Sequence, residues 1–103
     1  MQKIEIIGNL GGDTARRNGA DGKSFLSFQV AVSTQNTTNW YGVLMPYKER
    51  IEPYLTKGAK VFVRGDLKIN VHTLNDGRQV VDLDIFAKEI ELVGGKLAEE
   101  NPL

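Results

Sequence analysis

The sequence predicts one all-β domain, a five-stranded Greek-key barrel with a single short helix between the third and fourth strands. Three observations support this fold class. Apolar residues alternate with period two over most of the chain, only one segment has helical spacing, and an Asn-Asp-Gly turn joins the last two long strands. The 103 residues suffice for one domain with a modest core. We expect that domain to cover residues 1–95, followed by a short, flexible, acidic tail at residues 96–103.

The first half of the chain contains three expected strands. KIEIIG forms the first, and the Gly-, Asn- and Asp-rich segment that follows is a long turn region with room for a short strand around residues 14–17. SFLSFQVAVST alternates regularly, which places Leu26, Phe28, Val30 and Val32 on one side. A QNTTN turn then leads into WYGVLMP, where Pro46 ends the ladder because it lacks an N–H donor.

The second half contains the helix and a long hairpin. In YKERIEPYLTKG, Ile51 and Leu55 are four residues apart and Gly58 is a suitable stop, but Pro53 removes a donor, so a short or kinked helix is expected. AKVFVRGDLKINVHTL is a long strand with a bend expected at Gly65, and the chain returns through RQVVDLDIFAKEIELV. This order of elements is that of the Greek-key barrel that binds oligonucleotides or oligosaccharides.

Composition excludes several classes of protein. The chain has no cysteine, which rules out disulfides, thiol catalysis and cysteine-bound zinc, and one histidine, His72, is too few for a His-based metal site. Thirteen basic and thirteen acidic residues cancel, which argues against a strongly basic nucleic-acid binder but allows local charged patches. MQKIEIIGNL does not resemble a secretion signal and no segment is a candidate membrane span, so we expect a soluble, cytoplasmic protein.

Enzyme signatures are weak. Asp82 and Asp84 share one strand face, and we interpret them as solvated residues opposite Val81, Leu83 and Ile85. GNLGG lacks the Lys-Ser or Lys-Thr and the helix of a phosphate-binding loop. We interpret His72, near a hairpin tip, as a surface residue. The sequence therefore predicts a protein that is not an enzyme and needs no cofactor or metal.

Binding of a single-stranded nucleic acid is the stronger hypothesis, since it requires exposed aromatic rings and nearby cations. Alternation directs Trp40 outward, opposite Val43 and Met45, and Gly42 beside it leaves room for a flat ligand. The alternatives are that Trp40 caps one end of the barrel or lies at a subunit contact. Lys60, Arg64 and Lys68 share one strand side, either as a track for phosphates or as an ordinary solvated face. Basic residues dominate the first part of the chain and acidic residues its end.

The ordered motifs of the chain resemble the bacterial single-stranded DNA-binding protein family over about residues 1–95. The matching segments are KIEIIGNLGGD, FLSFQVAVS, TNWYGVLMPYKERIEPYLTKGAKVFVRGDL and NDGRQVVDLDIFAKEIELVGG. The resemblance implies an OB-fold that assembles into homodimers or homotetramers. It also implies that single-stranded DNA wraps over aromatic and basic residues during replication, recombination and repair, and that the protein associates with the nucleoid.

Carried over by position, the resemblance implies that Trp40 stacks a base and that Tyr54 is a packing residue. Lys3, Arg17, Lys48 and Lys68 match positions that are commonly basic in the family. The predicted DNA-binding set is therefore Trp40, Lys3, Arg17, Lys48, Arg64, Lys68 and, as a weak stacking group, His72.

The chain departs from the family at several of these positions. Pro46 replaces a frequent stacking Phe and His72 a frequent Trp or Tyr, while Asp66 and Asn70 occupy positions that are often Arg. The turn TQNTTN is shorter than usual and lacks aromatic and basic residues. Since each stacked base contributes about 1–3 kcal/mol, these losses predict weak to moderate binding with a small salt dependence.

The tail also differs, because the long linker of the family is nearly absent. EENPL could be a shortened form of the family's acidic, partner-recruiting tip, which would bind replication or repair proteins through Glu99, Glu100, Pro102 and Leu103, or it could be an ordinary frayed terminus. Two other functions remain open: a replication-accessory interaction module resembling primosomal replication protein N, with weak DNA binding, and a saccharide- or small-ligand-binding OB-fold that uses Trp40.

Overall fold

The computed structural model describes residues 2–94, which form six strands and one short 3-10 helix. All the strands expected from alternation are present, and the short strand expected around residues 14–17 is confirmed. The elements are β1 (Lys3–Leu10), β2 (Ala15–Asn18), β3 (Ser24–Ser33), β4 (Thr38–Pro46), η1 (Glu52–Tyr54), β5 (Lys60–Thr73) and β6 (Gln79–Leu92).

The five long strands close into a ring. The sheet order is β1-β5-β6-β4-β3-β2, and β1 also pairs with β3 at Asn9↔Ala31 and Leu10↔Val30. Only β4 and β6 pair in parallel within the described chain. Closure depends on Gly8, because a Cβ at this position would lie 2.3 Å from the carbonyl oxygen of Ala31. The ring therefore has the predicted Greek-key order, with β2 added outside it against β3.

The core fills the inside of this ring. Leu26, Phe28 and Val30 of β3 are all buried, which confirms the alternation expected for that strand. Complete burial of such a side chain contributes about 1.5–3 kcal/mol relative to its exposed state. The buried cluster consists of Ile6, Leu10, Leu26, Phe28, Val30, Val43, Met45, Leu55, Val61, Val63, Ile85 and Ala87.

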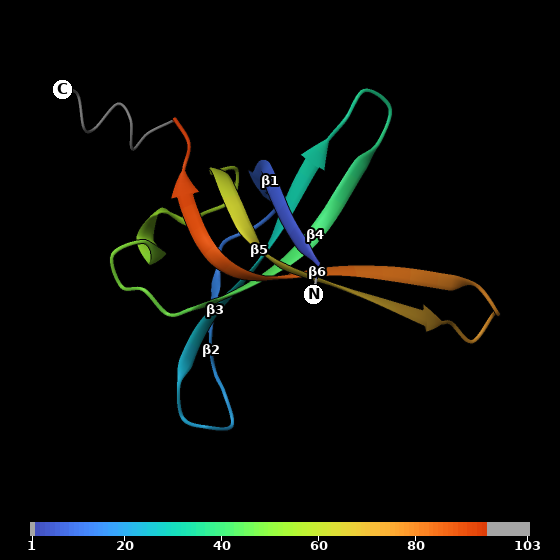
Figure 1. The fold of residues 1–103 in the computed structure, drawn as a ribbon, viewed down its shortest axis with the longest axis horizontal. Helices are drawn as coiled ribbons and strands as arrows, with labels where there is room; N and C mark the ends of the chain where they lie inside the picture. Colours follow the sequence, from blue (N-terminus) through green and yellow to red (C-terminus); the bar gives the residue numbers. More distant parts are fainter. Residues whose placement is uncertain (1, 95–103) are drawn as a thin grey trace.

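Three hairpins project from the ring: β2–β3, β3–β4 and β5–β6 (Figure 1). The chain consequently extends over 53 × 41 × 25 Å. The β3–β4 turn is held by the Thr34 N–H donating to the Thr37 carbonyl at 2.8 Å. The predicted Asn-Asp-Gly turn closes β5–β6, where Gly77 has a φ of 88° that favours glycine. The hairpins carry outward-facing strand surface well beyond the core.

The helix is shorter than the segment that predicts it. Only Glu52–Tyr54 is helical, in a 3-10 turn with no side-chain cap, and Pro53 explains the limit because it lacks the N–H that a longer helix would need. The turn still contributes to the core through Leu55, which is fully buried. No helix among residues 2–94 has both the length and the apolar character required to cross a membrane.

A bulge interrupts β5–β6 at the position where a bend was expected. Arg64 pairs with Glu89 but Gly65 pairs with Ala87, so Lys88 is an extra residue in β6. A bulge bends the strand and redirects the unpaired side chain. Lys88 is consequently exposed at the edge of the β4–β6 surface.

Candidate nucleic-acid interface

Trp40 is an exposed residue of β4. Its side chain is 52% exposed, whereas Val43 and Met45 of the same strand are 1% and 4% exposed. The predicted outward direction is confirmed, and a plug in the core is excluded. The indole is therefore accessible on the outer surface of the ring.

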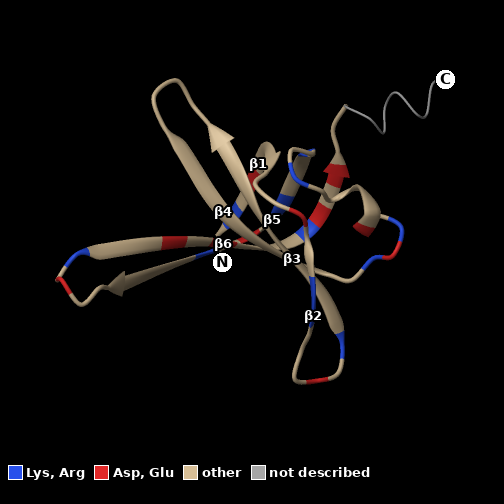
Figure 2. Ribbon diagram, turned by 180° about the vertical axis from the view of Figure 1, so that it is seen from behind, with Lys and Arg blue, Asp and Glu red and all other residues tan. Residues whose placement is uncertain are grey.

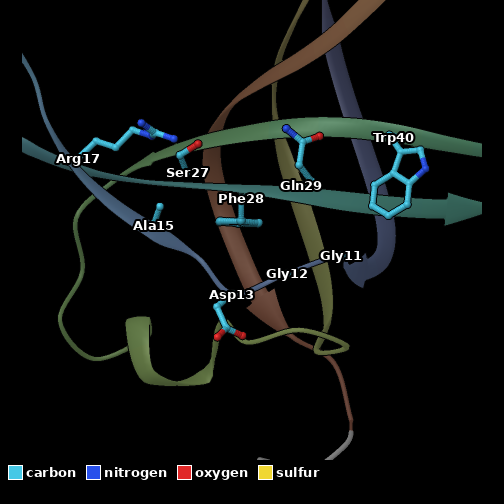
Figure 3. Close-up of a pocket in the computed structure, with 9 residues that line it drawn as sticks. All are labelled: Gly11, Gly12, Asp13, Ala15, Arg17, Ser27, Phe28, Gln29 and Trp40. Carbon is cyan, nitrogen blue, oxygen red and sulfur yellow. The ribbon is translucent and has the colours of Figure 1, made fainter.

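A groove of about 390 Å³ leads away from Trp40 across β3 toward β2. Figure 3 shows Arg17, Ser27, Gln29 and Trp40 arranged along β3, with Arg17 and Trp40 at the two ends. Its remaining lining residues are Gly11, Gly12, Asp13, Ala15 and Phe28. The groove thus combines an aromatic ring, a guanidinium and two neutral hydrogen-bonding side chains.

Gly11 supports the indole ring from below. A Cβ built on Gly11 would lie 2.4 Å from Cζ3 and 2.8 Å from Cη2 of Trp40, so any side chain at this position would push the ring away. The Gly11 N–H donates to the Gln29 carbonyl at 3.0 Å, which fixes this backbone against β3. The orientation of Trp40 therefore depends on a segment about 30 residues earlier in the chain.

Arg17 is placed in the groove by the pairing of β2 with β3, in which it lies opposite Phe25. Its neighbour Arg16 donates to Glu52 at 3.0 Å, and its guanidinium lies 4.1 Å from the ring centre of Tyr47. The hydrogen bond to Glu52 raises the pKa of Arg16 above its usual value. These contacts attach β2 to the segment after β4 and so help to hold Arg17 in position.

One acidic side chain also lines this groove. Asp13 accepts a hydrogen bond from the backbone N–H of Lys57 at 2.8 Å. Figure 3 shows it at the edge of the groove that faces the 3-10 turn, away from the row from Arg17 to Trp40. We interpret Asp13 as a structural residue that fixes the start of the β2 segment.

The space expected beside Trp40 is not free, and this prediction is wrong. A Cβ on Gly42 would lie 2.6 Å from Oδ1 of Asp84, which shows that the carboxylate covers Gly42. The parallel pairing of β4 with β6 sets these two residues opposite each other. A negative charge therefore lies on the same outer face as Trp40, where it repels phosphate groups.

Three members of the predicted binding set have acidic partners. Lys3 lies 3.6 Å from Asp66, Arg64 forms an ion pair with Glu89, and His72 Nε2 lies 2.7 Å from Asp82. The Oδ1 atom of Asp66 is buried with no hydrogen bond, so Lys3 is its nearest compensating charge. Lys3 and Arg64 each contribute less to a phosphate contact than an unpaired cation would, since the carboxylate competes.

The other predicted cations have no ion pair within residues 2–94. They are Arg17 in the groove, Lys48 just after β4, and Lys68 on β5. Lys68 pairs in register with Asp84, and Lys48 lines a smaller groove of about 170 Å³ together with Lys88. Trp40 and Arg17 thus share one groove, while Lys48 lines another.

The surface between the cations is uncharged. No Lys, Arg, Asp or Glu occurs from residue 26 to residue 47, and Figure 2 shows the whole β3–β4 hairpin without charge. Its tip carries Thr, Ser, Asn and Gln side chains, which donate and accept hydrogen bonds. A ligand on this hairpin would meet neutral polar groups.

Two aromatic residues of this outer face were not predicted from the sequence. Phe86 is 43% exposed and pairs in register with Leu44 of β4, and Phe25 pairs with Pro46. Alternation could have indicated this. Phe86 is an even number of residues from Asp82 and Asp84, which were predicted to face outward, so its side chain lies on the same face of the strand. Phe25 is an odd number of residues from Leu26 and Phe28, which were predicted to face inward, so alternation also directs Phe25 outward.

The side chains around Trp40 are suited to binding a ligand. No group of three or more His, Cys, Asp or Glu side chains within the described part of the chain is arranged to hold a metal ion. The groove near Trp40 instead offers a ring for stacking and a guanidinium for an anion, which are the elements of sequence-tolerant single-strand binding.

A closed ring of five strands in this Greek-key order, with a helical turn between β4 and β5, defines an OB-fold protein. The model of the single-strand binding protein family matches residues 1–93. The chain therefore belongs to the single-strand binding protein family. Members of this family are not enzymes, which confirms the corresponding prediction.

Similar proteins agree with this assignment. The single-stranded DNA-binding protein of Xanthomonas campestris pv. campestris is 29% identical, covering 93% of this chain and 62% of its own. That of Neisseria meningitidis is 31% identical with the same coverage. The chain thus spans about three fifths of the length of these relatives. A crystal structure of the mitochondrial single-stranded DNA-binding protein Rim1 from S. cerevisiae matches with a TM-score of 0.71 and 26% identity, over 89% of this chain and 94% of that one.

Proposed function

We propose that this protein binds single-stranded DNA with little sequence preference, and that it acts in DNA replication, recombination or repair. The observation that carries the proposal is the groove with exposed Trp40 at one end and Arg17 at the other. A base stacks on the indole at one end of the groove, and a phosphate farther along the strand lies near the guanidinium at the other end. Relatives named as single-stranded DNA-binding proteins support the ligand class.

The charge pattern determines how strong this binding is. Lys3 and Arg64 are held by acidic partners, Asp84 lies on the binding face, and the β3–β4 hairpin is neutral. For single strands the logarithm of affinity falls with the logarithm of salt by about 0.7 for each phosphate neutralised. We therefore propose weak to moderate affinity with a shallow salt dependence.

Trp40 is the only tryptophan of the chain, so its fluorescence reports directly on the site. The test is a titration of the protein with oligodeoxythymidylate at low and then moderate salt. Quenching that saturates and weakens moderately with salt is expected. An emission that does not respond even at low salt would refute stacking on Trp40. A response to oligosaccharides and not to DNA would indicate the saccharide-binding alternative.

Variants separate stacking from general damage to the fold. Trp40→Ala should lower affinity for a labelled oligonucleotide by about 5- to 100-fold, as expected for one stacked base, while Trp40→Phe should retain much of it. Tyr54→Ala is the matched control, because Tyr54 is also an exposed aromatic residue but lies on η1 outside the groove. Equal losses in Trp40→Ala and Tyr54→Ala would contradict the proposed site.

Self-association is a second part of the proposal. The described chain exposes Ile69, Val71 and Val81 at 48%, 58% and 55% on one face of the β5–β6 hairpin. Val71 and Val81 pair directly across the strands, so their side chains form a continuous apolar strip. Exposed apolar patches of this kind commonly mark protein contacts. We propose a homodimer or homotetramer in which copies of the chain cover this strip.

The cellular setting of the proposal is the cytoplasm, in association with nucleoid DNA. Recruitment of replication or repair proteins through Glu99, Glu100, Pro102 and Leu103 is a further part of it. These residues, like the whole expected tail at 96–103, lie outside the described ones. Removal of residues 96–103 should abolish partner binding and preserve DNA binding. Loss of DNA binding on this truncation would contradict separate roles for domain and tail.

A further inference from the structure

A second groove lies on the same outer surface as Trp40, toward the other end of β4. Its volume is about 460 Å³ and its exposed lining is mainly apolar, formed by Phe25 of β3, Leu44 and Pro46 of β4, and Phe86 of β6. The registers Leu44↔Phe86 and Pro46↔Phe25 place the two phenylalanines on either side of β4. Two aromatic rings from strands distant in sequence therefore flank one hollow.

Cations border this hollow. Lys23 and Lys88 line it, and both are exposed with no ion pair among the described residues. Lys48 lies next to it, in the smaller groove that shares Met45, Pro46, Ala87 and Lys88. Rings flanked by lysines are the combination that binds bases and phosphates of a single strand without sequence preference.

Two nearby acids do not remove this positive character. Asp21 lines the groove and keeps its negative charge, with Oδ1 accepting the backbone N–H of Lys23 at 3.0 Å, but the two lysines of the lining outnumber it. Glu89, beside Lys48, is paired with Arg64. Further acids share this face. Asp66, the β5 partner of Phe86, lies 3.6 Å from Lys3, and Asp82 lies 2.7 Å from His72. Asp84 covers Gly42 between the two aromatic sites.

We propose that the groove between Phe25 and Phe86 is a second nucleotide-binding subsite, on a path that runs along the outer face of β4 from Trp40. The inference rests on the proposed DNA binding and names further residues for it. Leu44 lies four positions after Trp40, which corresponds to about 13 Å along a strand. One chain of about 4–16 nucleotides, the site size of an OB-fold, covers both positions. On this path a base stacks on Phe86, and Lys88 and Lys23 contact phosphates. The strand passes near Asp84.

The path explains how the chain retains aromatic contacts although Pro46 is not aromatic. Pro46 lies between the two rings in the sheet, opposite Phe25 and two residues from Leu44, the partner of Phe86. The stacking surface at this end of β4 is thus supplied by its neighbours on both sides. Alternation within β4 alone does not reveal it.

The test measures affinity against oligonucleotide length. Wild type, Phe86→Leu and Phe86→Tyr are titrated with a short oligodeoxythymidylate that covers only the Trp40 groove, and with a longer one that covers both, using anisotropy together with Trp40 quenching. Phe86→Leu should lose about 5- to 100-fold in affinity for the long oligomer only, and Phe86→Tyr should retain it. Lys88→Ala should lower the salt slope for the long oligomer by about 0.7.

The outcomes separate this inference from the proposed function. Intact quenching with equal affinity of wild type and Phe86→Leu at every length refutes the second subsite and leaves the Trp40 site in place. No quenching and no binding in the wild type refutes both. Since Phe86 is 43% exposed, the variants should fold; Val80→Ala, 40% exposed on the hairpin arm, is the matched control. A change of oligomeric state in Phe86→Leu would show that the groove is covered by another copy, which also overturns the inference.

Discussion

Gly11 and Trp40 are in direct contact: a Cβ on the glycine would lie 2.4 Å from Cζ3 of the indole. The glycine belongs to the segment after β1 and the tryptophan to β4, so closure of the ring brings them together. The missing side chain of Gly11 thus determines the position of the ring on which a base is proposed to stack.

This contact predicts the effect of Gly11→Ala. The added methyl group should displace the indole and reduce the affinity for single-stranded DNA, with a shift in Trp40 emission in the absence of DNA. Gly12→Ala is the matched control: it also adds a methyl group to the groove lining, but nothing lies within 4 Å of that Cβ, so the emission of Trp40 without DNA should not shift. The same emission and affinity in Gly11→Ala and wild type would show that the contact is not needed.

The position of Asp84 over Gly42 predicts a gain of function. Asp84→Asn removes a negative charge from the binding face, which should tighten binding at low salt by about 1 kcal/mol, or roughly fivefold, with a smaller gain at higher salt. Glu49→Gln, in the loop after β4, removes an equal charge elsewhere and should have little effect. Unchanged or weaker binding in Asp84→Asn would exclude repulsion at this position.

Removal of an unpaired cation and removal of a paired one should change the salt dependence of DNA affinity to different extents. Arg17→Ala should reduce the slope of log affinity against log salt by about 0.7, because one phosphate contact is lost. Arg64→Ala should leave the slope nearly unchanged, since Glu89 already holds that guanidinium. Titrations at four or more salt concentrations measure both slopes. A larger effect of Arg64→Ala would place the phosphates on β5.

Closure of the ring leaves no space for a side chain at Gly8, so a substitution there should lower the stability of the protein. A methyl group there would meet the Ala31 carbonyl oxygen at 2.3 Å, and this backbone cannot move without disturbing the β1–β3 pairing. Gly8→Ala should lower the free energy of unfolding by about 1–3 kcal/mol, the usual cost of overpacking. Denaturant unfolding measures the loss, with Gly12→Ala as a control near zero. An unchanged midpoint would show that β1 adjusts without cost.

Self-association should depend on one face of the β5–β6 hairpin. Val71→Glu combined with Val81→Glu places two charges in the apolar strip and should reduce the assembly toward monomers in sedimentation equilibrium. Val80→Glu is a matched control, because Val80 is adjacent in sequence but on the opposite face, paired with His72. The same mass for the double variant and wild type would place the contact between copies elsewhere.

The sequence by itself determined the features that depend on local periodicity. Alternation within single strands predicted the strands, the burial of Leu26, Phe28 and Val30, and the exposure of Trp40, and Pro53 limited the helix within its own segment. Motif order predicted the OB-fold and the family. Each of these depends on neighbours along the chain or on the order of segments.

Only the tertiary structure decided which of the outward residues lie next to one another. Ring closure and the β4–β6 register set Gly11 under Trp40, Asp84 over Gly42, and Phe86 across from Leu44, and cross-strand pairing joined Lys3 to Asp66 and Arg64 to Glu89. These partners are far apart in sequence, so alternation assigns each one to a face but not to a neighbour. The binding surface is therefore a property of strand register, which the packing of the closed core determines.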